Sequence, residues 1–128
     1  MDNQFTILIV DDDPISAKLL RITLKKSFPS FHFNQVSDGL AAIEAFKQSP
    51  ADLIFLDIHI PKKDGIEVAK QIRTHEGPER KTVIIGLSAD IREAVIEEAL
   101  QAGMDGYIKK PVQQEAIIEN INRFITYK

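Results

Sequence analysis

The 128-residue sequence contains no cysteine, which excludes disulfide bonds, thiolate zinc sites and cysteine nucleophiles. It also lacks a long apolar run, because its longest stretches span four or five residues and a membrane-spanning helix needs about 20. The amino terminus has neither the basic start nor the apolar core of a signal peptide. A net charge of −3 gives no sign of the basic surface that binds nucleic acid. These absences predict a cytoplasmic protein without membrane or nucleic-acid partners.

Short apolar runs recur along the chain and predict the strands of a sheet. Residues 7–10, 53–56 and 83–87 are rich in Val, Ile, Leu and Phe without polar alternation, which is typical of parallel strands covered on both faces. Residues 31–36 alternate more and predict an edge strand, and residues 106–108 predict a short fifth strand. Because no repeat, linker or low-complexity segment separates the runs, we expect one domain over residues 1–128.

Helical patterns fill the intervals between the apolar runs. The first helix is predicted to begin at Pro14, after Asp13 as its N-cap, and to end near Pro29. Further helices are expected to be centred on Leu40–Phe46, to begin at Asp64–Gly65, to span about 90–102, and to run from about Gln113. Strict alternation of strand and helix favours an α/β fold in which right-handed crossovers place helices on both faces of a parallel sheet. The apolar residues assigned to the first helix are Ile15, Leu19, Leu20, Ile22 and Leu24.

Charged and polar residues collect where the predicted strands end. Ligands of open α/β sheets bind outside the carboxyl ends of the strands, so these side chains are candidates for a site. They are Asp11, Asp12 and Asp13 after the first strand, Asp57 at the end of the third, Ser88 at the end of the fourth, and Lys109 and Lys110 after the fifth.

Each of these residues has an ordinary structural interpretation when it is taken alone. Asp13 suits a helix N-cap, Ser88 could cap the fourth helix, and Lys110 could be a solvated lysine. Together they are harder to explain, because two carboxylates about 4 Å apart repel by ~4 kcal/mol at an effective dielectric constant near 20. A Mg²⁺ ion would remove that repulsion. A carboxylate beside it could then attack phosphorus, while Lys110 and the Ser88 hydroxyl stabilise the transferring group.

Four motifs resemble the receiver domain of two-component response regulators, over essentially the whole chain. They are ILIVDDDP (7–14), DLIFLDIHIPKKDG (52–65), VIIGLSAD (83–90) and GMDGYIKKP (103–111). The resemblance implies a flavodoxin-like (βα)5 doubly wound sheet with strand order 2-1-3-4-5. It also implies a signalling phosphoacceptor rather than an enzyme with turnover, in which the domain catalyses only its own phosphorylation and dephosphorylation.

The resemblance further implies a role for individual residues. Asp57 would be the phosphoacceptor, and Asp12 and Asp57 would bind Mg²⁺, or Mn²⁺ in its place, together with the backbone carbonyl of His59. Asp11 would assist through a water molecule. The expected phosphate-binding and switch residues are Ser88, Ala89, Lys110 and Tyr107, with a cis peptide bond before Pro111.

The sequence departs from the family pattern at a few positions. Ile60 stands before Pro61 where methionine is frequent, and Ser88 replaces the commoner threonine but keeps the hydroxyl. His59, two residues after the acceptor, is less usual. We interpret it as a rim residue that tunes water access during dephosphorylation, with Ala89 and Asp90 as further candidates.

The resemblance also suggests partners. A phosphohistidine on a histidine kinase or histidine phosphotransfer domain would be the donor, docking on the first helix. The fourth helix, fifth strand and fifth helix would form the output face, for a downstream protein effector or a homodimer. The sequence leaves open whether this is a stand-alone regulator or the receiver of a hybrid histidine kinase.

Three other functions are alternatives to that of a receiver domain. A haloacid-dehalogenase-like, Mg²⁺-dependent phosphohydrolase would use the spacing of Asp11 and Asp13, but the first helix begins at once and no cap domain is present. A flavodoxin-like cofactor binder would need a phosphate-cradling loop where this chain has an anionic cluster. A degenerate receiver that acts only in docking is disfavoured by the intact acidic set.

Overall fold

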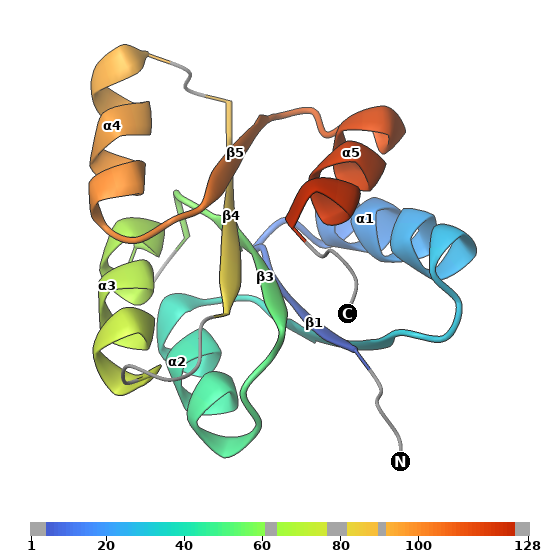
Figure 1. The fold of residues 1–128 in the computed structure, drawn as a ribbon, viewed down its shortest axis with the longest axis horizontal. Coiled ribbons are helices and arrows are strands. Elements are labelled where there is room, and N and C mark those ends of the chain that lie inside the picture. Colours follow the sequence, from blue (N-terminus) through green and yellow to red (C-terminus); the bar gives the residue numbers. More distant parts are fainter. Residues whose placement is uncertain (1–4, 61–63, 77–81, 90–91, 125–128) are drawn as a thin grey trace.

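The fold is a five-stranded parallel sheet between two layers of helices, as seen in a computed structural model that describes residues 5–60, 64–76, 82–89 and 92–124. The strands are β1 (Thr6–Val10), β2 (His32–Val36), β3 (Leu53–Asp57), β4 (Val83–Ser88) and β5 (Gly106–Lys109). The helices are α1 (Pro14–Ser27), α2 (Gly39–Gln48), α3 (Gly65–Glu76), α4 (Glu93–Gln101) and α5 (Gln114–Phe124). Figure 1 shows α2, α3 and α4 on one side of the sheet and α1 and α5 on the other.

The order of the strands is β2-β1-β3-β4-β5, which confirms the predicted 2-1-3-4-5 topology. β3 is the middle strand, with β1 and β4 paired in parallel on either side of it, and all five of its residues are buried. β2 is an edge strand with exposed side chains at His32, Asn34 and Gln35, as its mixed pattern predicted.

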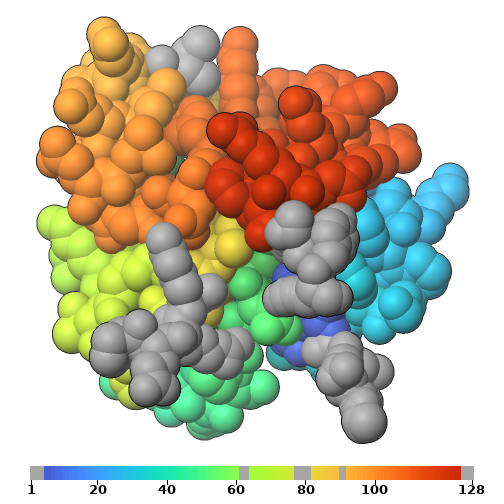
Figure 2. All heavy atoms as spheres, viewed as in Figure 1, coloured from blue at the N-terminus to red at the C-terminus, as the bar shows by residue number. Residues whose placement is uncertain are grey.

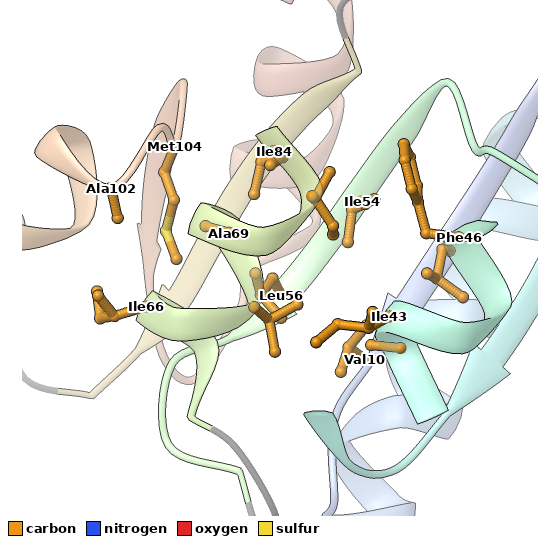
Figure 3. Close-up of a cluster of buried hydrophobic side chains, with 14 of the residues drawn as sticks. Val10, Ile43, Phe46, Ile54, Leu56, Ile66, Ala69, Ile84, Ala102 and Met104 are labelled. Carbon is orange, nitrogen blue, oxygen red and sulfur yellow. The ribbon is translucent and has the colours of Figure 1, made fainter. Parts of the chain in front are cut away.

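Two apolar layers cover the sheet because side chains of successive strand residues point to opposite faces. Under α2, α3 and α4 the strands contribute residues such as Val10, Leu56 and Ile84, which pack against Ile43 and Ala69 from the helices (Figure 3). On the opposite face, α1 and α5 cover a second cluster. In the space-filling view the atoms of α1 (blue) and α5 (red) lie on the side of the molecule away from α4 (orange) (Figure 2). The strand members of this second cluster are Ile7, Ile9, Phe33, Leu53, Phe55, Ile85, Leu87 and Ile108.

Helix α1 differs from the expectation of a single apolar stripe. Only Leu20 and Leu24 of the five predicted stripe residues are buried, together with Ala17. The other three stay exposed because positions 15, 19 and 22 lie on the opposite side of a helix with 3.6 residues per turn. Their exposed fractions are 70% for Ile15, 61% for Leu19 and 51% for Ile22.

Most helix boundaries agree with the sequence to within a few residues. The described part of α4 begins at Glu93, where the sequence predicted a start near residue 90. Asp90 itself lies outside the described residues, as does Pro61 of the motif after β3. No helix in the described ranges combines the length and the apolar character that crossing a bilayer requires.

Candidate functional site

Three aspartates meet at the carboxyl edge of the sheet. One carboxylate oxygen from each of Asp11, Asp12 and Asp57 lies within 4.8 Å of the others. Asp11 and Asp57 are buried, with 2% and 5% of their surface exposed, whereas Asp12 is open to solvent. The cluster follows from the topology, because β1 and β3 are adjacent parallel strands that end at the same edge.

The neighbouring carboxylate of Asp13 does not belong to this cluster. Its Oδ1 accepts a hydrogen bond from the amide of Ile15 at 3.1 Å, so it is the N-cap of α1, as the sequence indicated. Its own amide donates to Oδ1 of Asp11 at 3.0 Å and holds that side chain in place. This geometry disfavours the phosphohydrolase alternative, in which Asp13 would be a chemical group.

Lys110 extends its ammonium group into the acidic cluster. Its Nζ lies 2.9 Å from Oδ2 of Asp57 and 3.2 Å from Oδ2 of Asp11. The backbone is fixed by a hydrogen bond from the Lys110 amide to the carbonyl of Ser88 at 2.9 Å, and the Lys110–Pro111 peptide bond is cis. Lys109, one residue earlier, is exposed, so of the two candidate lysines it is Lys110 that reaches the carboxylates.

Burial and neighbouring charges shift the pKa values of Asp57 and Lys110. Burial raises the pKa of Asp57 above its usual value and the charge of Asp11 adds to the increase, while the hydrogen bond and charge of Lys110 and the amide of His59 oppose it. Burial alone would lower the pKa of Lys110, but the hydrogen bond and charge of Asp57, with those of Asp11, raise it. Lys110 therefore stays protonated at neutral pH and serves as the counter-ion of the cluster.

The donor set fits a hard divalent cation. Oδ2 of Asp11 is buried, and the charged group that it meets among the described residues is the Lys110 ammonium at 3.2 Å, which leaves this oxygen room to bind a cation as well. Carboxylate oxygens, one of them beside solvent at Asp12, are the ligands that Mg²⁺ prefers, because this ion retains several water molecules. The three aspartates could thus hold a metal ion between them.

The remaining predicted residues lie on or just after β4 and β5. Ser88 is buried at the end of β4, next to the strand that carries Asp57, and the amide of Ile58 donates to the carbonyl of Leu87 at 3.0 Å. Ala89 is exposed beyond it. Tyr107 is half-buried and packs against the apolar cluster beneath α4.

His59 lies at the rim of the site. It is exposed, and its backbone amide donates to Oδ1 of Asp57 at 3.1 Å. Among the described residues, the clustered ligand atoms come from the three aspartates and not from the imidazole of His59. Asp90, the other predicted rim residue of this kind, lies outside the described residues.

Gly65 fixes the approach of α3 to the site. A Cβ atom at this position would lie 2.5 Å from the carbonyl oxygen of Asp57 and 2.7 Å from Cα of Ile58. The Gly65 amide also donates to the carbonyl of Ile58 at 2.8 Å. Only glycine allows the helix to begin this close to the backbone of Asp57 and Ile58.

A groove of about 420 Å³ opens beside the cluster, and the sequence interpretation missed it. It runs between α1 and the segment after β5, and two of its lining residues, Ile15 and Leu19, belong to the exposed face of α1. Apolar residues on two faces of one helix were the signal that could have revealed it. Further lining residues are Asp13, Ala89, Lys110 and Pro111.

Known proteins resemble this chain along most of its length. A family model described as the response regulator receiver domain matches residues 7–122. The chemotaxis protein CheY of Halobacterium salinarum is 32% identical, and the match covers 94% of this chain and 96% of CheY. Probable histidine kinase 6 of rice is 31% identical over 93% of this chain, but the match spans only 14% of that longer protein.

Solved structures agree with the sequence matches. The receiver domain of a sensor histidine kinase from Pseudomonas aeruginosa, with a magnesium ion coordinated in its active-site cleft, superimposes with a TM-score of 0.84 at 27% identity. That match covers 98% of this chain and all of the other. The receiver domain of Ssk1 from Saccharomyces cerevisiae, solved with the phosphotransfer protein Ypd1, gives 0.87 at 28% identity and covers 97% and 90% of the two chains.

Proposed function

Because this chain belongs to the response regulator receiver domain family of two-component systems, we propose that Asp57 accepts a phosphoryl group from a phosphohistidine. The proposal treats residues 1–128 as one receiver domain. The observation that carries it is the position of the Lys110 ammonium group, 2.9 Å from Asp57 and 3.2 Å from Asp11 at the edge of the acidic cluster. An ammonium group at this position can stabilise negative charge that develops on a group bound to Asp57.

In the proposed reaction, a carboxylate oxygen of Asp57 attacks phosphorus and the bond from phosphorus to the imidazole nitrogen of the donor breaks. The departing imidazole keeps the electron pair of that bond. Negative charge on the equatorial oxygens of the transferring group is stabilised by Lys110 and by the hydroxyl of Ser88. Asp11, Asp12, Asp57 and the carbonyl of His59 would hold Mg²⁺, or Mn²⁺, whose charge neutralises the cluster and the phosphoryl oxygens.

The same residues would reverse the modification and transmit it. Water would attack the phosphorus of phospho-Asp57, so the domain would catalyse its own dephosphorylation and have no turnover on an external substrate. A phosphoryl group on Asp57 would draw Ser88 inward with Ala89, and Tyr107 would follow into the space that Ser88 leaves. The face formed by α4, β5 and α5 would then present a changed surface to a protein effector or to a second copy of the chain, in the cytoplasm.

The chemical test is intact-mass measurement after incubation with Mg²⁺ and a small phosphodonor such as acetyl phosphate or phosphoramidate. The wild-type protein is expected to gain the mass of a single phosphoryl group, and chelation of divalent ions is expected to prevent the gain. No gain with either donor, or an equal gain without divalent ions, would contradict the proposal.

The exposed face of α1 is the proposed docking surface for the donor. Ile15, Leu19 and Ile22 are more than half exposed. Ile15 and Leu19 line the groove, which Lys110 also borders. An apolar surface of this kind on a short helix suits a partner helix that buries it. The Ssk1 receiver domain, solved in complex with Ypd1, shares this fold.

Replacing Leu19 with glutamate is expected to slow phosphoryl transfer from a phosphotransfer protein at least tenfold. Burial of a leucine side chain contributes ~1.5–3 kcal/mol, and each ~1.4 kcal/mol corresponds to a factor of ten in affinity. Transfer from acetyl phosphate should not change, because the site itself is intact. Leu40→Glu is a matched control, since Leu40 is 52% exposed on α2 in the other helical layer. Equal loss in both variants would argue against α1 as the docking surface.

Replacing His59 with alanine is expected to accelerate the hydrolysis of phospho-Asp57 severalfold. The exposed imidazole stands two residues from the acceptor, and its removal opens the rim to the attacking water. The measurement is loss of phosphoryl mass with time after the donor is removed. His32→Ala, on the exposed edge strand, is the control and should hydrolyse at the wild-type rate. Identical rates for His59→Ala and the wild type would refute the rim role.

A further inference from the structure

Arg73, in the last turn of α3, joins three parts of the chain at the sheet edge opposite the acidic cluster. Its Nε and Nη2 donate to the carbonyl oxygen of Gly103 at 3.0 and 2.8 Å. Nη2 also donates to Oδ2 of Asp105 at 2.8 Å, and Nη1 donates to the carbonyl oxygen of Thr82 at 2.6 Å. One guanidinium group thus links α3, the start of β4 and the turn between α4 and β5.

Two carboxylates complete this network. Glu76 accepts a hydrogen bond from Nη1 of Arg73 at 2.9 Å and one from the amide of Thr82. Asp105 accepts from the amide of Ile84 at 2.9 Å through the oxygen that also receives Arg73. Both carboxylates are largely buried, with side-chain exposures of 4% and 17%. Such charge-assisted hydrogen bonds at partly buried positions are stronger than neutral ones.

The turn that Arg73 holds is the carboxyl end of α4. This helix has no basic residue in its own last turn, so Arg73 supplies from α3 the positive charge that a helix carboxyl end favours. The aliphatic part of Arg73 packs on Gly103, whose φ is +112° and whose Cβ, if present, would lie 2.7 Å from Cγ of Arg73. The turn is therefore held by packing as well as by hydrogen bonds.

The amino end of α4 contributes less to the core. Val95 packs against the apolar cluster there but stays partly exposed. Ala99 is the one buried residue among those of α4 itself, and the next buried side chains, Ala102 and Met104, follow at the carboxyl end. Few buried contacts at one end and a charged network at the other predict unequal local stability along the helix.

We propose that Arg73 is the fixed pivot of α4: it anchors the carboxyl end of the helix to α3 and β4, and the amino end, with fewer buried side chains, has the lower local stability. Movement of the amino end in signalling rests on the proposed function. Phosphorylation of Asp57 would displace this end of α4, which follows β4 and Ser88. The anchor itself is a property of the unmodified protein and can be measured without phosphorylation.

Amide hydrogen exchange in the unmodified protein tests the anchor. The amides of Ala102 and Met104 report on the carboxyl end, since they donate to the carbonyls of Glu98 and Ala99, and those of Val95 and Ile96 report on the amino end. In the wild type we expect the first pair to exchange at least tenfold more slowly than the second. In Arg73→Met this difference should disappear, with rates normalised to amides of β3 so that global destabilisation is removed.

Two further variants keep the exchange test decisive. Arg73→Lys retains the charge and the fold but cannot reach the carbonyls of Gly103 and Thr82 with one ammonium group, so it should also reduce the difference. Lys70→Met, an exposed residue one turn earlier on α3, should preserve it. The proposal is overturned if the wild type shows equal rates at both ends, or if both Arg73 variants keep the wild-type difference.

A measurement on the phosphorylated protein distinguishes a failure of the proposed pivot at Arg73 from a failure of the function proposed for Asp57. With acetyl phosphate and Mg²⁺, chemical-shift changes in the wild type should be larger at Glu93–Ile96 than at Ala102–Met104, and in Arg73→Lys they should extend to both. Changes that are largest at Ala102–Met104 in the wild type would overturn the pivot. A protein that takes no phosphoryl group would contradict the function proposed for Asp57, while the exchange result would still decide the anchor.

Discussion

Replacing Asp57 with asparagine is expected to abolish phosphoryl incorporation completely. Asparagine has almost the same shape and can still accept the hydrogen bond from the amide of His59, so the fold should be retained. Its amide group is not a competent nucleophile, however, and it removes one of the three negative charges of the cluster. Intact mass after incubation with Mg²⁺ and acetyl phosphate should show the phosphoryl gain in the wild type and none in the variant.

Asp13→Asn is the matched control for this substitution. Asp13 lies beside the cluster in sequence, but its carboxylate is engaged at the N-terminus of α1, where asparagine is about as effective a cap. The variant should be phosphorylated like the wild type. If Asp57→Asn gained a phosphoryl group, or if Asp13→Asn failed to gain one, Asp57 would not be established as the acceptor. The aspartates that follow β1 would then become candidates.

Replacing Lys110 with alanine is expected to change two measurements in opposite directions. Phosphorylation should slow by ~10²–10³-fold, the usual effect of removing one group that stabilises charge in a transition state. Mg²⁺ should bind more tightly, because the ammonium group that competes for Asp57 and Asp11 is gone and two carboxylates about 4 Å apart repel by ~4 kcal/mol. Stopped-flow phosphorylation and calorimetric titration with Mg²⁺ measure the two effects.

Lys109→Ala provides the comparison for Lys110→Ala. The two lysines are adjacent in sequence, but Lys109 is exposed at the end of β5 and none of the described contacts directs it to the cluster. Its removal should alter neither rate nor affinity. If Lys110→Ala were phosphorylated at the wild-type rate, or if Mg²⁺ bound it more weakly, the ammonium group would not be the phosphate-binding charge.

The sheet and its reactive edge were predictable because their causes are local. Buried parallel strands need continuous apolar runs such as 7–10 and 53–56, and the alternation with helices fixes where those strands end. The residue that follows each run is then placed at one edge of the sheet, which brings Asp11 and Asp57 together without knowledge of any distance. The specific strand order came from the resemblance to receiver domains.

Other features depend on contacts between residues far apart in the sequence and could not be predicted. Arg73 lies 30 residues from Gly103 and 32 from Asp105, and no periodic pattern relates these positions. The exposed side of α1 was missed for a different reason. Five apolar residues within ten positions were assigned to one stripe, although Ile15 and Leu20 are too far apart around the helix to be buried together.

The position of Asp57 on the middle strand has a consequence for the lifetime of an acyl phosphate there. β3 pairs with β1 and β4 and its five residues are buried, so local opening of an outer element of the domain would leave this strand in place. Spontaneous loss of the group would therefore depend on solvent entering from above the strand end, past His59. Variants that weaken the fold elsewhere should leave the decay half-life unchanged as long as the protein remains native.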